Sequence, residues 1–416
     1  MSVPSNILTQ VQTYQLAHLA FLQNYGCFIH TANKKFKDFQ KFTGNLGDSV
    51  SFDLPPRFVT EPTLVATFQP SAQRVQVLTV NNALNTAYAY TSQQMIFNVE
   101  RYMEIFGKAA VAEIATGVEA NVAGLAETQP YRFYGNGVDQ ISSFGQLAQM
   151  LAQYRTYGYA HENIKVYLAD TAVPLIVNSG LNQFVMDRNE EMSMSWMVGD
   201  WMGVNFYQSN LLPIHYAGNA GVLAQTLTVV STNDPTGNNI TSITFSGVSA
   251  SDLDCIKRYD SLQFKDNVSG QPNMRFLTFI GHKPSAAFVQ VAATADAAST
   301  AGSQVTVSIT PALCSVAGNA NQNISFNVVA GMQMTVLPTH RCGLVVGGDA
   351  LYLAMPQLPD QSPFITANTI DDETGVSLRL THGATFGQNQ LGFINDVIWG
   401  STAPAEYLMK LAFPLS

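Results

Sequence analysis

An abrupt change of sequence character near Ala217 limits most strongly what this chain can fold into. From Ala217 to Leu337 the sequence is rich in Val, Thr, Ser and Asn, has no helical periodicity, and separates short apolar runs by turn clusters such as 233–237. Such a series of runs predicts the strands of a small β-barrel or sandwich. The predicted strands are 226–230, 241–245, 261–265, 275–280, 288–291, 305–309 and 324–329. We therefore predict that 217–337 is an all-β module inserted into another fold.

Both flanks of this module mix helices with strands. Apolar residues recur every three or four positions between Thr91 and Glu127, which predicts a long amphipathic helix. Its apolar stripe consists of Ile96, Val99, Met103, Phe106, Ala110, Ile114, Val118, Val122 and Leu125. We expect the first four of these side chains to be buried against the chain's own sheet. Shorter patterns predict a helix from Ser142, a strand at 164–168 and a helix at 175–182.

After the module the mixed pattern returns. Further strands are predicted at 344–346, 351–353, 376–380, 392–399 and 407–413. The chain is therefore expected to leave one α+β fold near 217 and to rejoin it near 340.

The N-terminal part predicts a helix at 7–28 and then a two-stranded arm at 48–80. Apolar and polar residues alternate in two runs of the arm, which is the period of a β-strand, and a proline-containing stretch separates the runs. The alternating apolar residues are Val50, Phe52, Leu54, Val75 and Val77. Because an isolated hairpin is marginally stable in water, we expect the apolar face of the arm to lie on another copy of the chain.

The surface of this protein carries little charge. Charged residues make up 12% of the chain, about half the usual share of roughly 25%. Hydrophobic residues make up 46%, which excludes a disordered chain. A low-charge surface has little like-charge repulsion to keep copies apart. The composition therefore fits either a soluble enzyme from a low-charge proteome or a protein that packs against copies of itself.

Charge and cysteine content narrow the function classes further. The net charge of −9 argues against nucleic-acid binding over the whole surface, although a local basic run at 34–37, with Lys41, faces either phosphate or solvent. The four cysteines form no CxxC pair, so neither zinc nor disulfides are indicated and a reducing compartment fits. Neither a signal peptide nor an apolar run of about 18 residues is present, so no membrane segment is predicted.

No catalytic motif is complete. The segment 161–165 begins like a two-histidine zinc helix, but Lys165 stands in place of the second histidine. His340 and Cys342 are one residue apart and would suit a metal only if further ligands join them. The acidic run 371–373 suits either a cation with oxygen ligands or a solvated turn. We therefore predict no catalytic residue, metal site or cofactor.

The order of these elements resembles the major capsid protein of a tailed bacteriophage with the Hong Kong 97 capsid fold. More narrowly, it resembles the podovirus coat-protein type that carries an inserted β-barrel. The resemblance covers nearly the whole chain. The segments that carry it are VQVLTVNNALNTAYAYTSQQMIFNVERY from Val75, GVEANVAGLAE, DQISSFGQLAQMLAQYRTYGYAHENIKVYLADTAV, VGDWMGVNFYQSNLLPIH from Val198 and GGDALYLAMPQLP from Gly347.

The resemblance implies an α+β, Hong Kong 97-like fold with axial and peripheral domains, an extended loop, a spine helix and an inserted all-β barrel. The implied divisions are 1–47 (N-terminal arm and helix), 48–90 (extended β-loop), 91–130 (spine helix and peripheral domain), 131–216 (first part of the axial domain), 217–337 (inserted barrel) and 338–416 (return to the axial and peripheral domains).

The resemblance also implies a function. Such proteins self-assemble into the pentamers and hexamers of an icosahedral shell that encloses double-stranded DNA; they catalyse nothing and hold no cofactor. The implied partners are other copies of the chain, a scaffolding protein and a portal during assembly, packaged DNA through weak interior contacts, and any decoration protein, with no membrane. The resemblance further implies assembly in the host cytoplasm and a final location in the virion.

Seven residues of the arm and of the barrel are the expected assembly contacts. They are Asp48, Phe52, Arg57, Val75, Val77, Asp234 and Asn238. Two alternative functions remain: another structural virion protein, of the tail or of the decoration type, and an enzyme with a β-barrel insertion.

Overall fold

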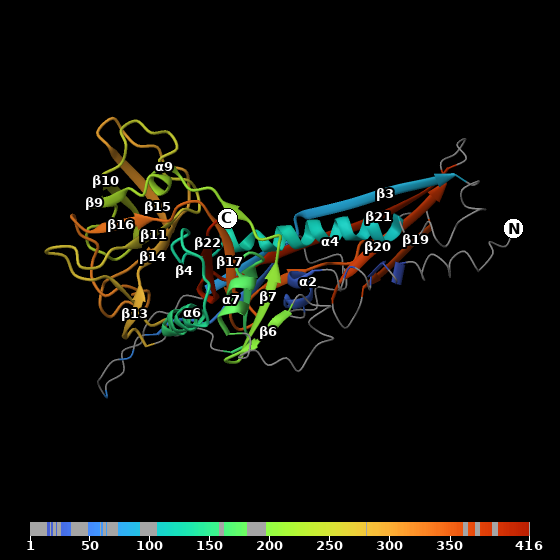
Figure 1. The fold of residues 1–416 in the computed structure, drawn as a ribbon, viewed down its shortest axis with the longest axis horizontal. Helices are drawn as coiled ribbons and strands as arrows, with labels where there is room; N and C mark the ends of the chain where they lie inside the picture. Colours follow the sequence, from blue (N-terminus) through green and yellow to red (C-terminus); the bar gives the residue numbers. More distant parts are fainter. Residues whose placement is uncertain are drawn as a thin grey trace.

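The computed structural model describes most of the chain. The described residues are 15–16, 18–19, 22, 26–34, 49–58, 60, 64, 74–91, 106–157, 162–180, 197–279, 281–360, 365–370, 375–384 and 390–415. They form an elongated molecule with a β-barrel at one end, a mixed sheet in the middle, and a helix beside long strands at the other end (Figure 1). Strands outnumber helices among these residues, so the fold is α+β with mostly strands.

The predicted barrel is confirmed. Its strands follow one another in the closed order β10, β15, β14, β11, β16 and β9. The bounds are β9 (Thr226–Thr232), β10 (Ile240–Ser246), β11 (Ser261–Phe264), β14 (Gln290–Ala293), β15 (Gln304–Leu313) and β16 (Gln333–Val336), with a separate hairpin of β12 (Arg275–Leu277) and β13 (Pro284–Phe288). On β15, Val305, Val307 and Ile309 are buried and the residues between them are exposed. Closure pairs each barrel strand on both sides, so no strand edge is left open.

Two strand predictions in this module are corrected. The run 324–329 forms no strand, and β16 closes the barrel instead. The side chains of Asn323 and Asn327 donate hydrogen bonds to backbone carbonyls elsewhere in the barrel, which holds this run as a loop, and Phe326 is half exposed. The run 275–280 shortens to β12, which lies in the hairpin and not in the barrel.

The middle of the molecule is a seven-stranded sheet in the order β4, β22, β17, β5, β7 and β6, with β8 beside β17. The bounds are β4 (Phe133–Tyr134), β5 (Ile164–Ala169), β6 (Met197–Trp201), β7 (Val204–Ser209), β8 (Ile214–His215), β17 (His340–Val346) and β22 (Leu408–Phe413). The chain enters the barrel after β8 and returns from it into β17, and these two strands are paired antiparallel. All barrel strands lie between the end of β8 at His215 and the start of β17 at His340.

Short helices accompany this sheet. They are α2 (Cys27–Thr31), α6 (Phe144–Thr156), α7 (Val173–Gly180) and α9 (Asn219–Val222), with the 3₁₀ turn η3 (Ala405–Tyr407). Ser143 starts α6 with a capping box, in which its hydroxyl accepts from the Gln146 amide at 3.3 Å. The predicted helices from Ser142 and near 175–182 are thus confirmed. Of the predicted helix at 7–28, most lies outside the described residues.

The far end of the molecule is a five-stranded sheet in which β18, β21, β20 and β19 are consecutive and β3 pairs with β21. The bounds are β3 (Asn82–Thr91), β18 (Tyr352–Ala354), β19 (Ile365–Ile370), β20 (Ser377–Ala384) and β21 (Gln390–Thr402). The residues of β3 fall almost entirely in the division 48–90, the extended β-loop, where no separate strand is predicted after 80. Thr91, the expected start of the long helix, is the last residue of β3, and stacking of Tyr88 on Phe393 fixes the strand to β21.

The long helix is confirmed where it is described. It comprises α4 (Lys108–Ala123) and α5 (Leu125–Thr128), and α4 lies along β3 and β21 (Figure 1). Ile114, Val118 and Val122 are buried, as the apolar stripe predicts. The expectation for Phe106 is wrong, because this side chain is 45% exposed. Phe106 lies in a π turn at 106–107, outside α4 and its buried stripe. The remaining expected core residues, Ile96, Val99 and Met103, lie outside the described residues.

Candidate functional site

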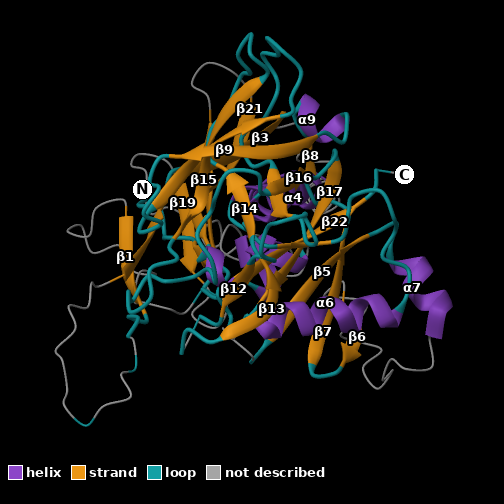
Figure 2. Cartoon of the chain, turned by 90° about the vertical axis from the view of Figure 1, so that its left-hand side faces the viewer, coloured by secondary structure: helices purple, strands orange, loops and turns teal. Residues whose placement is uncertain are grey.

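The predicted arm is a two-stranded antiparallel ribbon of β1 (Ser49–Leu54) and β2 (Arg74–Thr79), and β1 lies at the margin of the molecule in Figure 2. Directly paired residues of such a ribbon project from the same face. Phe52 is paired with Gln76, whereas Val77 is paired with Ser51. The expectation that Phe52 and Val77 share one apolar face is therefore wrong, because this register puts them on opposite faces.

The face that carries Phe52 packs on the chain's own body. Val50 and Leu78 of this face are 6% and 0% exposed. The Phe52 ring meets Tyr352 of β18 edge to face, with the centroids 4.4 Å apart. On the same face, Gln76 donates a hydrogen bond of 2.8 Å to Thr402 of β21. We call this side the inner face of the arm, and it belongs to the core of the single chain.

The opposite side, the outer face of the arm, presents Val75 and Val77. Their side chains are 47% and 50% exposed. Ser51 and Asp53 are their direct partners on β1. Val75 and Val77 lie two positions apart on β2 and together form a small exposed apolar surface.

The two other arm residues in the predicted set have different positions. Asp48 lies outside the described residues. Arg57 follows β1 and contacts its own chain, since its guanidinium group pairs with Glu406 at 3.4 Å and lies 4.0 Å above the Phe279 ring. Sequence reasoning missed Glu406 and Phe279, because no local pattern marks a single residue that meets a distant arginine.

The predicted barrel loop between β9 and β10 is exposed and internally braced. Asp234 accepts hydrogen bonds from the side chain and amide of Thr236 and from the amides of Asn238 and Asn239. These bonds, with that from the Thr236 hydroxyl the largest, lower the pKa of Asp234. Asn238 in turn accepts a 2.8 Å bond from the side chain of Asn319 in another loop. The loop is thus held in one shape at the barrel surface.

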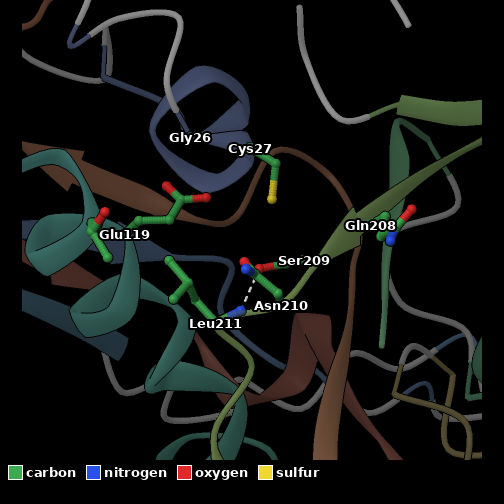
Figure 3. A pocket seen from close by; sticks show the side chains of 8 residues that line it. Gly26, Cys27, Glu119, Gln208, Ser209, Asn210 and Leu211 are labelled. Atoms are coloured by element: carbon green, nitrogen blue, oxygen red, sulfur yellow. Dashed lines mark hydrogen bonds between the residues drawn. The ribbon is translucent and has the colours of Figure 1, made fainter. Parts of the chain in front are cut away.

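A cavity of about 150 Å³ lies between α2, α4 and the end of β7 (Figure 3). Glu119 of α4 lines it and accepts hydrogen bonds from the amides of Phe28, at 2.6 Å, and Ile29, at 2.9 Å. Burial raises the pKa of Glu119, and it raises the pKa of the neighbouring Cys27 thiol well above its usual value. Both carboxylate oxygens are therefore occupied in capping α2, and the neutral thiol is a weak nucleophile. This arrangement supports a structural role for the cavity wall.

A buried polar cluster joins the barrel to the central sheet. His215, on β8, is hydrogen-bonded through Nδ1 to Glu127 at 2.9 Å and through Nε2 to Asp260 at 2.8 Å. Asp260, which precedes β11, also accepts from the backbone amides of Gly218 and Lys257. The imidazole of His215 therefore bridges α5 of the body and the barrel. The sequence offered no signal for this bridge, since its members are far apart along the chain.

His340 and Cys342, the predicted candidate metal pair, are both buried on β17. His340 Nδ1 donates to the Pro338 carbonyl at 2.7 Å. Burial raises the pKa of Cys342 to about 11. The fully buried Lys410 ammonium donates to Ser261 at 3.2 Å beside them. Within the described part of the chain, no group of three or more His, Cys, Asp or Glu residues could hold a metal ion. Glu162 and Lys165 are described, but His161 and 371–373 lie outside the described residues.

Comparisons with known proteins give structural matches. No family model matches the sequence, and no curated protein matches it. The capsid of Ralstonia phage GP4 is 6% identical, with 93% of this chain and 88% of that chain covered at a TM-score of 0.44. The chain resembles phage capsid proteins in structure. The capsid of cyanophage P-SCSP1u is 11% identical, with 92% and 89% covered at 0.40, and a virus-like particle from Pyrococcus furiosus is 5% identical, with 97% and 99% covered at 0.41.

In the described part of the chain, no helix is both long and apolar enough to span a bilayer.

Proposed function

We propose that this chain is the major capsid protein of a tailed bacteriophage, with the Hong Kong 97 fold and the inserted barrel of the podovirus coat-protein type. One observation carries the proposal: the order of elements along the chain. A two-stranded arm is followed by a long strand and a long helix, then by a mixed sheet that a closed barrel interrupts between β8 and β17. The sequence resembles such coat proteins in the same order.

The proposal includes self-assembly into the pentamers and hexamers of an icosahedral shell around double-stranded DNA. Two exposed features are suited to contacts between copies. The outer face of the arm offers Val75 and Val77, and the braced barrel loop offers Asp234 and Asn238. With 12% charged residues, the surface opposes close contact between copies only weakly.

Further partners belong to the same proposal. A scaffolding protein and a portal would act during assembly in the host cytoplasm, and a decoration protein would bind outside where one exists. The net charge of −9 favours weak rather than tight contact of the chain with packaged DNA. The divisions 1–47, 48–90, 91–130, 131–216, 217–337 and 338–416 are part of this proposal.

Electron microscopy of the expressed full chain tests the proposed function. We expect shells, spirals or rings of five or six copies in negative stain, either alone or with a coexpressed scaffolding candidate. Tubes would instead indicate a tail protein. A strictly monomeric species at high concentration, with and without scaffold, would contradict self-assembly.

A further inference from the structure

Three arginine side chains gather around Glu406 at the far end of the arm. Arg57 follows β1, Arg74 begins β2, and Arg132 precedes β4. The Nη2 atoms of Arg57 and Arg74 both donate to Glu406 Oε1, that of Arg57 at 3.4 Å. Arg132 Nη2 donates to the backbone carbonyl of Glu406 at 3.0 Å. Guanidinium groups from three separate segments thus converge on one residue of η3, and we call this group the arginine cluster.

Aromatic rings form the walls of the arginine cluster. Arg57 and Arg74 lie 4.0 Å and 5.4 Å from the centroid of the Phe279 ring, in the loop between β12 and β13. Arg132 lies 4.4 Å from the centroid of the Tyr157 ring. A ring face attracts a cation, but it offers no strong acceptor to the in-plane N–H groups of a guanidinium. These rings therefore do not satisfy the hydrogen-bonding capacity of the guanidinium groups.

The charges of the arginine cluster do not balance. Among the described residues, the Glu406 carboxylate pairs with Arg57 and Arg74. Arg132 donates to backbone carbonyls instead, so three guanidinium charges lie around one carboxylate. Each arginine also has one nitrogen, shielded from solvent, without a hydrogen-bond partner in the described structure: Arg57 Nε, Arg74 Nη1 and Arg132 Nε. A buried donor without an acceptor and a buried charge without a counter-charge are both destabilising. One additional negatively charged acceptor would relieve both.

Two of the three arginine side chains in the cluster are partly exposed to solvent. The side chains of Arg57 and Arg74 are 15% and 24% exposed, whereas Arg132 is 3% exposed and forms the floor. Guanidinium groups bind carboxylate and phosphate oxygens through paired N–H donors. We propose that the arginine cluster is an oxyanion-binding site, in which Arg57 and Arg74 contact the anion and Arg132 adds positive charge beneath it. This inference does not depend on the proposed capsid function.

Calorimetric titration of inorganic phosphate into the full chain tests this site. Chloride is exchanged for phosphate at constant ionic strength, so that general screening is held fixed. We expect saturable phosphate binding. Its affinity should weaken at least about tenfold in Arg74→Gln and in Arg57→Gln, because each variant loses one positively charged guanidinium group with its paired N–H donors. Arg155→Gln is the matched control, since Arg155 is partly exposed, lies outside the arginine cluster and donates to the Met202 carbonyl. Its phosphate affinity should equal that of the wild type.

A second variant gives an effect of opposite sign. Glu406→Gln keeps an oxygen acceptor for Arg57 and Arg74 but removes the competing negative charge, so phosphate should bind about tenfold more tightly. Far-UV circular dichroism shows whether each variant is folded. If an Arg→Gln variant is unfolded, Arg74→Lys is used in its place, because lysine keeps the positive charge but lacks the paired N–H donors of the guanidinium group. Absence of saturable phosphate binding in both the wild type and Glu406→Gln overturns the proposal. Equal affinities in Arg74→Gln and Arg155→Gln also overturn it.

The same titration distinguishes between two alternative sources of the natural oxyanion. It is either a free phosphate-type ion or the carboxylate of an acidic side chain from a second copy of the chain. If a second copy supplies it, phosphate affinity falls as the protein concentration is raised into the range of self-association, because the two anions compete. If a free ion supplies it, phosphate affinity is the same in separate and associated chains. Either result supports the site and assigns its occupant.

Discussion

His215 and His340 are directly paired across β8 and β17, the strands that carry the chain into and out of the barrel, and their ring centroids lie 5.4 Å apart. Their electrostatic surroundings differ. Burial disfavours a charged His215, but hydrogen bonds with Asp260 and Glu127 raise its pKa above the usual value. Burial, together with the charge of Lys410, lowers the pKa of His340 to about 3. The junction is therefore built for one charged and one neutral imidazole.

Acid should weaken this junction through His340. Its pKa is 6.5 in an unperturbed state and about 3 when folded, so the unfolded chain binds more protons between these values. Stability is therefore lost as the pH falls from 6.5 towards 3, by a few kcal/mol to order of magnitude. His340→Asn keeps an N–H near Nδ1 and cannot titrate, so its stability should fall less between pH 6.5 and 5. Urea unfolding at each pH measures the difference.

The sign of this effect separates the two histidines. His215, with its raised pKa, contributes stability that is present below pH 6.5 and is lost as the pH rises through its folded pKa. Of this pair, His340 is therefore the one that loses stability in acid. Burial also lowers the pKa of His18 and His382, and these two contribute equally to the acid response of the wild type and of His340→Asn. His282→Asn is the control. His282 lies in a barrel loop with a φ of 48°, a conformation that asparagine accepts, so the stability of this variant should depend on pH as that of the wild type does. An unchanged acid slope in His340→Asn would contradict the prediction.

The two faces of the arm should respond differently to charge. Val77→Asp puts a carboxylate on the half-exposed outer face, so it should change the free energy of unfolding by less than about 0.5 kcal/mol and still block assembly. Leu78→Asp puts the same group at a position with 0% exposure, so it should destabilise the chain by several kcal/mol. Denaturant unfolding and electron microscopy of both variants measure these effects. Val138→Asp, at an exposed valine outside the arm, should assemble normally.

Glu119 should stabilise the chain by accepting from backbone amides. Glu119→Ala leaves the amides of Phe28 and Ile29 without their acceptor, which should reduce the free energy of unfolding by about 2–4 kcal/mol. Glu119→Gln keeps one oxygen acceptor and should lose only about 1 kcal/mol. Because burial raises the pKa of Glu119, the wild type should also lose stability relative to Glu119→Gln as the pH rises above 4.5. Equal losses in the Ala and Gln variants would contradict the capping role.

Local sequence patterns predicted the secondary-structure elements. They did not predict contacts between residues that are distant along the chain. Alternation at Val305, Val307 and Ile309 reveals a strand of the barrel because it depends only on neighbouring residues. The same reasoning placed Phe52 and Val77 on one face, since the pairing register of two strands is not visible in either strand alone. The bridge from His215 to Asp260 and the arginine cluster require contacts between distant segments. They were therefore found only in the folded structure.

The barrel should fold as a separate unit when 217–337 is expressed alone. Most residues of its core come from the barrel itself, and a module of about 120 residues buries enough apolar surface to be stable. The body contributes Tyr131 and Tyr157 to that core, where their rings lie 6.0 Å and 5.4 Å from Phe276. The isolated barrel should therefore be folded but expose an apolar surface around Phe276.

Circular dichroism and dye binding check this expectation. The fragment should give a β-rich spectrum, a cooperative unfolding transition, and stronger binding of a hydrophobic dye than the full chain, because the two tyrosine rings no longer cover Phe276. Phe276→Ser should reduce the dye binding if the isolated barrel stays folded. A fragment that is unfolded or mainly helical would contradict an independent barrel. It would also remove the feature that distinguishes the proposed coat-protein type from the plainer capsid fold.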